Sequence, residues 1–304
     1  MKGLVVRSTG SWYDVSTDEG QIKARLKGKL RLSIKDVNNP VAVGDWVQLA
    51  QGDSKEWLIT EVVPRTNYLV RKSTHRSAQA HLIASNLDQC LLLATLVYPR
   101  TSLGFIDRFL VSVETFRIPT MLVINKVDLL DEEGLAYLQH VKSIYESIGY
   151  PTAEVSALQG IGLGKVKEFL KGKITLISGH SGVGKSSLIN AIAPDLRLRT
   201  GEVSNFAQKG IHTTTFAEMF DLGEGTRIID TPGIKELGLM EVGEEELSHY
   251  FPEMRMFLNQ CKFHNCRHLN EPDCRIQTAV DKGEIAPERY NSYLSMIAGE
   301  DNRK

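Results

Sequence analysis

Long hydrophobic runs are missing from this 304-residue sequence. The longest apolar stretch lies at about residues 90–97, whereas a membrane-spanning helix needs about 20 apolar residues. Residues 1–7 contain neither a long apolar segment nor a small-residue cleavage site. We therefore expect no membrane span, no membrane partner and no secretory signal, and we expect a cytoplasmic protein.

Cysteine is scarce, and neither sign of charge dominates. Three of the four cysteines lie between positions 261 and 274, which is typical of a metal site in a reducing compartment rather than a disulfide framework. Thirty-six basic residues against 37 acidic ones give a net charge of −1, so the chain as a whole carries no basic field for nucleic acid. At 42% hydrophobic and 24% charged residues, the composition excludes wholesale disorder and collagen-like repeats. Nothing in this balance indicates oligomers, so we expect a monomer.

The residue pattern divides the chain into three parts. Residues 1–66 read as short strands separated by turns, which favours a small all-β barrel of the OB-fold type. Residues 67–242 alternate apolar runs with helical stretches, which is typical of an α/β domain with a mostly parallel sheet. Residues 243–304 are polar and helical and contain the Cys/His cluster.

The expected elements can be placed by residue number. Strands of the barrel are expected at 4–8, 13–16, 21–32, 45–49 and 57–63. Strands of the central part are expected at 91–97, 120–124, 152–156, 173–178, 216–221 and 226–230, and helices near 104–117, 134–148, 162–171 and 186–193.

One expected barrel strand has a basic face. Between residues 21 and 32, apolar residues fall on even positions and basic residues on odd positions, so a strand would present the two kinds on opposite faces. Two interpretations are open: a solvated outer surface, or a surface that binds the RNA or DNA backbone. Residues 1–35 hold eight basic against three acidic side chains, which favours the second. The candidate RNA-binding residues are Lys23, Arg25, Lys27, Lys29 and Arg31.

The three tryptophans of the first part also allow two interpretations. Trp12, Trp46 and Trp57 could stack on bases, but we favour the view that they anchor the barrel core.

Residues 173–192 contain a phosphate-binding motif. A strand runs into G-x-x-x-x-G-K-S, and a helix follows, which is the context that defines a P-loop. Its glycines let backbone N–H groups surround phosphates, and the helix N-terminus favours negative charge. Lys185 is expected to reach the β- and γ-phosphates and Ser186 to bind Mg²⁺. The P-loop candidates for binding GTP are Gly179, His180, Ser181, Gly182, Val183, Gly184, Lys185, Ser186 and Ser187.

Further motifs indicate guanine nucleotides. Asn125-Lys126-Val127-Asp128 follows an apolar strand and matches N-K-x-D, in which an aspartate can accept from two guanine donors that adenine lacks. Ser156 and Ala157 match the S-A-x loop beside the base. Asp230 and Gly233 fit D-x-x-G near Mg²⁺ and the γ-phosphate. Among Thr213, Thr214 and Thr215, we choose Thr214 as the second Mg²⁺ ligand, although its neighbours are nearly as suitable.

The order of these motifs is unusual. GTPases ordinarily place the P-loop first and N-K-x-D and S-A-x last, whereas here those two come first, at 125 and 156. The central part is therefore predicted to be a circularly permuted GTPase domain, since new chain ends are tolerated on surface loops. Because the segment after Asp230 now leads into the C-terminal part, we hypothesise that the nucleotide state moves that part.

The residue that usually orients the attacking water is absent. Ile234 follows D-x-x-G, and an apolar side chain cannot orient water, so intrinsic hydrolysis should be slow. His212, just before the threonines, is one candidate for this catalytic role beside Lys185 and Thr214. An exposed loop histidine and a group supplied by a partner remain the alternatives.

The cysteine cluster predicts a structural zinc site. Cys261, Cys266, His268 and Cys274 offer three thiolates and an imidazole within fourteen residues, a set that fills all four positions of tetrahedral zinc. His264 is an alternative fourth ligand, but it lies closer to Cys261 and would need a tighter loop, so we favour His268. Cys90, at the edge of an apolar strand, is expected in the core. The basic residues around the cluster, which could contact RNA phosphate or form a solvated rim, are Lys262, Arg267 and Arg275.

Taken together, these features resemble the RsgA family of small-subunit-dependent GTPases, also called YjeQ or YloQ. The resemblance covers essentially the whole chain and includes the permuted motifs, the OB-like start and Cys-x4-Cys-x-His-x5-Cys. Further matching segments are Val43-Gly44-Asp45-Trp46-Val47, Arg71-Lys72 and Gly210-Ile211-His212-Thr213-Thr214-Thr215.

The resemblance implies a GTPase that binds the 30S subunit and its rRNA during late maturation, is stimulated by it and leaves after hydrolysis. It also implies zinc at Cys261, Cys266, His268 and Cys274, and a role for His212 in hydrolysis. The domains then become an OB-fold RNA-binding domain (1–66), a circularly permuted GTPase domain (67–242) and a zinc-binding helical domain (243–304).

Two other functions stay open from the sequence. The first is a GTP-dependent RNA-binding adaptor whose turnover is incidental. The second is a stand-alone nucleotide hydrolase whose flanking domains bind a protein, in which case activity should be insensitive to RNA and to high salt.

Overall fold

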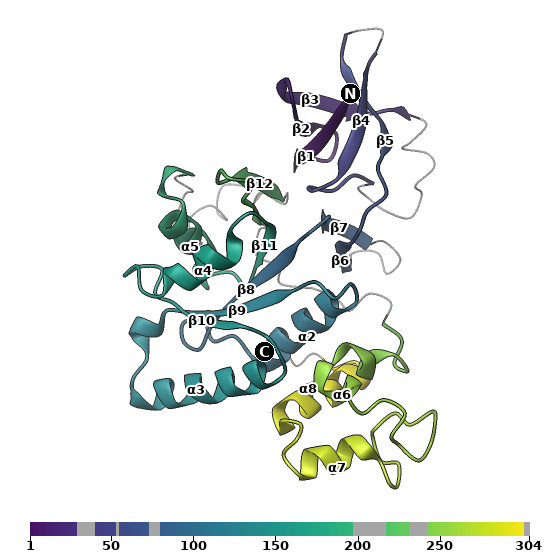
Figure 1. The fold of residues 1–304 in the computed structure, drawn as a ribbon, viewed down its shortest axis with the longest axis vertical. Coiled ribbons are helices and arrows are strands. Elements are labelled where there is room, and N and C mark those ends of the chain that lie inside the picture. The colour runs from purple at the N-terminus through teal and green to yellow at the C-terminus, as the bar shows by residue number, and fades with distance from the viewer. Residues whose placement is uncertain (29–39, 53–54, 73–79, 197–216, 231–241, 301–304) are drawn as a thin grey trace, which may run out of the picture.

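The computed structural model describes residues 1–28, 40–52, 55–72, 80–196, 217–230 and 242–300 (Figure 1). Among these residues, none of the helices has the length and apolar character needed to cross a bilayer.

Five strands close into a barrel at the N-terminal end of the molecule (Figure 1). The strands pair in the order β1-β2-β3-β5-β4, and β4 pairs back onto β1. Alternate residues point inward around an apolar centre that includes Val5, Tyr13, Val15 and Ile59. This closure confirms the predicted OB-like barrel. The strand bounds are β1 Lys2–Ser8, β2 Tyr13–Thr17, β3 Gly20–Leu26, β4 Trp46–Gln51 and β5 Trp57–Val62.

The basic face of β3 exists where the structure describes it. Lys23, Arg25 and Lys27 are exposed, whereas Ala24 is buried. The period of two therefore separates charge from core as the sequence predicted. Lys29 and Arg31 lie outside the described residues.

The expectation that the tryptophans anchor the core is wrong for two of them. Trp12 is 41% exposed and Trp46 is 36% exposed. Trp12 lies in the turn between β1 and β2, and Trp46 takes an outward position at the start of β4. A cation covers each ring, Arg25 over Trp12 at 4.7 Å and Lys2 over Trp46 at 4.6 Å. Trp57 is half-buried against the barrel core.

The central part is built on six strands in the order β10-β9-β8-β11-β13-β12. Neighbours run parallel except β12, which is antiparallel to β13. This confirms a mostly parallel sheet and adds an antiparallel edge strand. The bounds are β8 Gln89–Thr95, β9 Thr120–Asn125, β10 Thr152–Glu154, β11 Ile174–Ser178, β12 Glu218–Asp221 and β13 Arg227–Asp230.

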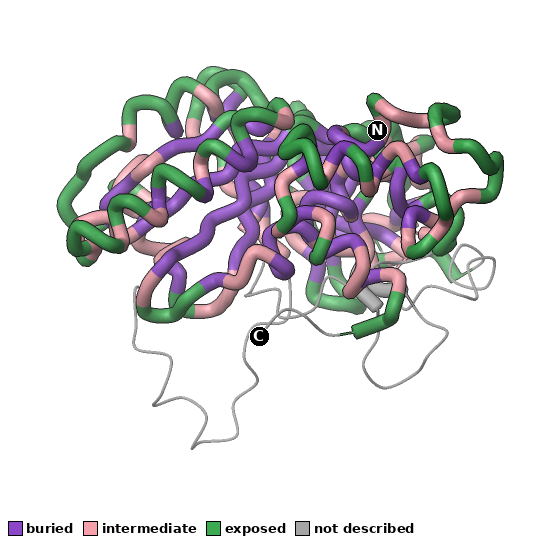
Figure 2. Tube along the Cα trace, turned by 90° about the horizontal axis from the view of Figure 1, so that it is seen from below, coloured by how far each residue is buried: buried purple, intermediate pink, exposed green. Residues whose placement is uncertain are grey.

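Helices cover both faces of this sheet, and the core is buried throughout (Figures 1 and 2). Leu92 faces α2 and α3, whereas Leu91 and Leu93 face α4 and α5. Double coverage explains why these strands read as continuous apolar runs. Cys90 is fully buried as expected. The bounds are α2 Leu103–Glu114, η1 Val127–Leu129, α3 Glu132–Ser147, α4 Leu163–Leu170, α5 Lys185–Ile192 and η2 Pro194–Leu196.

Two features were not anticipated from the sequence. An antiparallel hairpin, β6 (Tyr68–Lys72) with β7 (Ala80–Ser85), lies between barrel and sheet. Arg7 of β1 also pairs with Glu218 of β12, so barrel and central sheet are continuous.

The C-terminal part packs beside α2 around a small core of its own. Its helices are η4 Leu247–Tyr250, α6 Pro252–Arg255, α7 Arg275–Asp281 and α8 Pro287–Ile297.

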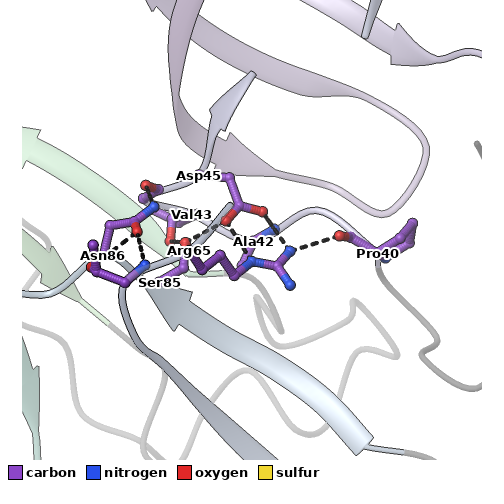
Figure 3. Close-up of polar contacts among 9 residues, drawn as sticks. Pro40, Ala42, Val43, Asp45, Arg65, Ser85 and Asn86 are labelled. Carbon is purple, nitrogen blue, oxygen red and sulfur yellow. Dashed lines mark hydrogen bonds and ion pairs between the residues drawn. The ribbon is translucent and has the colours of Figure 1, made fainter. Parts of the chain in front are cut away.

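A buried carboxylate ties the barrel to the following hairpin (Figure 3). Asp45 is fully buried and accepts two hydrogen bonds from Arg65 at 2.7 Å and one from Ser85 at 2.6 Å. Its Oδ2 also accepts the backbone N–H of Ala42 at 2.8 Å. Arg65 in turn donates to the carbonyl of Pro40, and its hydrogen bonds to Asp45 raise the pKa of its guanidinium. The satisfied carboxylate thus joins three segments of the chain.

Removing Asp45 should destabilise this junction. In Asp45→Ala, Arg65 loses its counter-ion, and the Ser85 hydroxyl and the Ala42 N–H lose their acceptor, which should cost about 2–4 kcal/mol of unfolding free energy. Urea denaturation followed by tryptophan fluorescence measures this. Glu56→Ala is the control, because it breaks an exposed ion pair with Arg25 at 3.8 Å, which should cost under about 1 kcal/mol. Equal urea midpoints for the two variants would contradict the assignment.

Candidate functional site

The P-loop joins the end of β11 to the start of α5, and two of its glycines are sterically required. Gly179 has φ +151°, and a Cβ there would lie 2.3 Å from the carbonyl oxygen of Leu93. Gly184 has φ +97°, and a Cβ there would lie 2.4 Å from Nδ2 of Asn125. The loop therefore folds directly against the neighbouring strand ends, with its backbone at the N-terminus of α5.

Asn125 holds three loops together. Its Nδ2 donates to the carbonyl of Val183 at 2.8 Å, and its Oδ1 accepts the N–H of Ala157 at 3.0 Å. The side chain is 3% exposed, so both contacts are shielded from water. The structure thus brings the predicted N-K-x-D, S-A-x and P-loop segments together at one edge of the sheet.

Lys126 adds a second connection to the P-loop. Its Nζ donates to the carbonyl of Gly182 at 2.8 Å and also to the carbonyl of Tyr98. Lys126 has a left-handed φ of +63°, after which Val127 and the half-buried Asp128 begin η1. Tyr98 was not anticipated, because its contribution is a backbone carbonyl and carries no sequence signal.

Lys185 lies inside the loop that it follows. Its Nζ donates to the carbonyls of Gly179 at 2.8 Å and His180 at 3.0 Å. Burial lowers the pKa of Lys185, and the negative charge of Asp230 acts in the opposite direction. Ser186 and Ser187 are half-buried in the first turn of α5.

Asp230 ends the strand beside the P-loop strand. It pairs in register with Ile177, two residues before Gly179. Ser156 is fully buried, and its hydroxyl accepts the N–H of Gln159 at 3.2 Å. These residues converge at the carboxyl ends of parallel strands, where open α/β sheets bind ligands. His212, Thr214 and Gly233 lie outside the described residues.

Three cysteines and one histidine form a second site in the C-terminal part. The Sγ of Cys261 lies 3.9 Å from the Sγ of Cys274 and 3.6 Å from Nδ1 of His268, and Cys274 lies 3.5 Å from the same nitrogen. With Cys266, all four donor atoms lie within 4.8 Å of one another. Metal–sulfur bonds of about 2.3 Å and metal–nitrogen bonds of about 2.0 Å give tetrahedral edges of about 3.5–3.8 Å, so this set fits one tetrahedral ion. His264 is exposed and is not part of the cluster.

Neighbouring side chains support the loop that carries these ligands. Tyr290 donates to the carbonyl of His268 at 2.6 Å, and Tyr293 donates to the carbonyl of Arg267 at 2.7 Å. Glu271 accepts three backbone N–H groups of the same loop. Burial raises the pKa of the Cys266 thiol to about 12, and binding of a metal ion would favour the deprotonated thiolate.

The basic residues around the cluster are already paired. Lys262 contacts Asp273 at 2.8 Å, Arg267 contacts Glu244, and Arg275 contacts Glu284 at 2.5 Å. An acidic side chain therefore lies within ion-pair distance of each of these three basic residues.

Comparison with known proteins settles the family. The model of the RsgA N-terminal domain matches residues 2–59, and the model of the RsgA GTPase domain matches residues 62–240. The chain belongs to the RsgA family. It is therefore a GTPase with circularly permuted motifs, as the sequence predicted.

Relatives of RsgA type match over the full length. The chain is 50% identical to "Small ribosomal subunit biogenesis GTPase RsgA 2" of Bacteroides thetaiotaomicron, covering 100% of this chain and 98% of that protein. It is also 50% identical to the RsgA of Cytophaga hutchinsonii, covering 100% of both. YjeQ from Thermotoga maritima superposes with a TM-score of 0.78 at 37% identity, covering 100% of this chain and 99% of that one. The structure described as YloQ, a circularly permuted GTPase, gives 0.73 at 31%, covering 100% and 96%.

Asn125 should be essential to the site. Asn125→Ala leaves the carbonyl of Val183 and the N–H of Ala157 buried without their partner, which should cost about 1–3 kcal/mol. We expect the affinity for a fluorescent GDP analogue to fall roughly 10- to 100-fold, because about 1.4 kcal/mol of lost binding free energy lowers the affinity tenfold. The control is Gln159→Ala, which alters an exposed residue of the loop that contains Ala157. This variant should bind the GDP analogue normally. Unchanged affinity in Asn125→Ala would refute the role.

The Cys261, Cys266, His268 and Cys274 cluster is expected to bind one metal ion that can be measured. Elemental analysis of the purified protein should find one metal ion per chain, and Cys274→Ser should lose it because three donors leave the coordination incomplete. His264→Ala and Cys90→Ala, which alter residues outside the cluster, should keep it. Retention of the metal by Cys274→Ser, or its loss in His264→Ala, would show that the ligand set is different.

Proposed function

We propose that this GTPase binds the small ribosomal subunit and assists its late maturation, with the nucleotide state controlling binding and release. The observation that carries the proposal is the full-length match to proteins named small ribosomal subunit biogenesis GTPase, which extends through both flanking parts. A GTPase domain alone would not specify a partner.

The nucleotide is assigned to the sheet edge where the P-loop and N-K-x-D loop meet. Asp128 reads guanine because a carboxylate accepts from two donors at once. Lys185 contacts the β- and γ-phosphates, and Asn125 and Lys126 hold the loops in place. Ser186 and Thr214 would hold Mg²⁺, which would neutralise phosphate charge. The remaining proposed GTP contacts are Val127, Ser156, Ala157, Gly179, His180, Ser181, Gly182, Val183, Gly184, Ser187, Asp230 and Gly233.

Water activation is assigned to His212, with a group of the ribosomal subunit as the alternative. Ile234 follows the D-x-x-G motif and has no polar atom with which to orient water. Slow intrinsic hydrolysis that a partner accelerates fits this arrangement.

Zinc is the ion that we propose for the Cys261, Cys266, His268 and Cys274 site. Three thiolates and one imidazole suit zinc, and four protein donors leave no open position for catalysis. The ion would therefore stabilise the C-terminal part instead of reacting.

The barrel is proposed to contact rRNA through its basic face. Lys23 and Arg25 of β3 and Lys27 directly after it are exposed, and Arg25 lies over the exposed ring of Trp12 at 4.7 Å. Cations that neutralise phosphates beside an aromatic surface that can stack on a base are typical of proteins that bind single-stranded nucleic acid. Lys29 and Arg31 extend this set in the sequence.

The first experiment measures multiple-turnover GTP hydrolysis with and without purified small subunits. Strong stimulation by small subunits and not by large ones is expected, and Lys185→Ala should abolish it because the phosphate contact is lost. Equal rates with and without small subunits, together with no GTP-dependent binding to them, would refute the partner. Tight, GTP-dependent subunit binding without stimulation would instead favour an RNA-binding adaptor with incidental turnover.

A variant of the barrel separates RNA contact from catalysis. Replacing Lys23, Arg25 and Lys27 together by alanine should preserve basal hydrolysis and reduce stimulation, with a shallower dependence of subunit binding on salt. The matched control replaces Lys165, Lys167 and Lys171 of the α4 region and should be stimulated normally. Equal losses in both triple variants would count against a specific barrel surface.

A further inference from the structure

The first turn of α2 lies directly beside the P-loop. The ring of Phe105 is 1% exposed, and its centroid lies 3.6 Å from that of the His180 imidazole, with 31° between the ring planes. The loop before this helix is also close, since a Cβ on Gly182 would lie 3.4 Å from Cδ of Pro99. A shift of α2 would therefore displace a residue inside the P-loop.

Two residues further along α2, Asp107 is fully buried and joined to the C-terminal part. Its Oδ1 accepts Nη1 of Arg289 at 2.6 Å and the hydroxyl of Tyr145 at 2.7 Å. Arg289, on α8, is 1% exposed, and its Nε donates to Glu253 of α6 at 2.6 Å. One guanidinium thus bridges carboxylates from both parts of the molecule.

The two buried carboxylates depend on the positive charge of Arg289. Burial raises the pKa of Asp107, and the positive charge of Arg289 opposes that rise. Without the guanidinium, two carboxylates would be buried with no counter-ion, which folded proteins avoid. A planar fork that donates in several directions can serve both acids, whereas an ammonium group acts as a point charge.

The same helix also supports the metal-binding loop. Tyr290 and Tyr293 follow Arg289 within about one turn, and their hydroxyls donate to the carbonyls of His268 and Arg267. Contacts therefore run from the P-loop through Phe105 and Asp107 to Arg289, and from α8 to the loop that carries the ligands.

We propose that Arg289 is a positioning residue for the nucleotide site: by docking α8 on Asp107 it fixes α2, and Phe105 then holds the P-loop at His180. Nucleotide affinity and docking of the C-terminal part are therefore coupled. The coupling is reciprocal, because each event must strengthen the other by the same factor. The proposal rests on the P-loop as the nucleotide site.

The test is a double-mutant cycle on the full chain. Arg289→Lys keeps the charge and loses the fork, and we expect it to weaken binding of a fluorescent GDP analogue about 5- to 50-fold, within the range of measured couplings between sites. Phe105→Leu keeps an apolar side chain at this buried position and removes the aromatic ring beside His180. If the effect passes through Phe105, Arg289→Lys should have little further effect in the Phe105→Leu background.

Phe109→Leu is the matched control. Phe109 lies one turn further along α2 and is also 1% exposed, but in the described part of the chain the phenylalanine ring that lies against His180 is that of Phe105. In the Phe109→Leu background, Arg289→Lys should retain its full effect. If Arg289→Lys had the same effect on GDP affinity in both phenylalanine backgrounds, general destabilisation would explain the result and the proposal would be overturned.

The reciprocal readout is amide hydrogen exchange in α7 and α8. GDP should slow exchange there in the wild-type protein and in Phe109→Leu, and should fail to do so in Phe105→Leu. GDP binding with no change in α7 and α8, or normal affinity in Arg289→Lys, would overturn this inference alone. Absence of GDP binding to the wild-type protein would instead refute the nucleotide site itself.

Discussion

A buried amide at the edge of the central sheet is the interaction on which the nucleotide site depends. Asn125 donates to the P-loop and accepts from the loop beside Ser156, and the segments it joins lie 58 and 32 residues away along the chain. An amide suits this position because it carries a donor and an acceptor in a fixed geometry. Aspartate would lose the donor and bring a charge into a place shielded from water.

This contact also explains how a permuted chain keeps the architecture of the site. β8, β9, β11 and β13 are parallel, so their carboxyl ends meet at one edge whatever order the chain follows. Asn125 ends β9, the P-loop follows β11, and Asp230 ends β13. The geometry depends on strand neighbours and side-chain bridges, and not on the sequence order of the motifs.

Local patterns were sufficient for most of the fold and for the motifs. The apolar runs of β8 and β9 and the alternation in β3 predicted buried and half-buried strands because burial sets those patterns. The same reasoning failed for Trp12 and Trp46. In a turn or at the start of a short strand, the sequence pattern does not show whether an aromatic side chain points into the core or toward solvent. It also missed the β6–β7 hairpin, which contributes to the junction between the parts.

Long-range polar contacts were beyond the sequence for a different reason. Asp107 and Arg289 are 182 residues apart, and each reads as a surface charge on an amphipathic helix. Asp45 and Arg65 are likewise ordinary until barrel and hairpin enclose them. Buried ion pairs of this kind add little net stability compared with apolar packing. Here they join parts of the chain that lie far apart in the sequence and so define how those parts are oriented.

These constraints bear on the hypothesis that the nucleotide state moves the C-terminal part. Asp230 ends β13, and the C-terminal part is held on α2 by the contact between Arg289 and Asp107. A free swing of the C-terminal part would separate Arg289 from Asp107 and leave charges buried without partners, which is costly. A movement that retains this contact must carry α2 with it, and Phe105 would then displace His180. In this architecture, a movement of α8 that keeps Arg289 paired with Asp107 and carries α2 along would also change the P-loop.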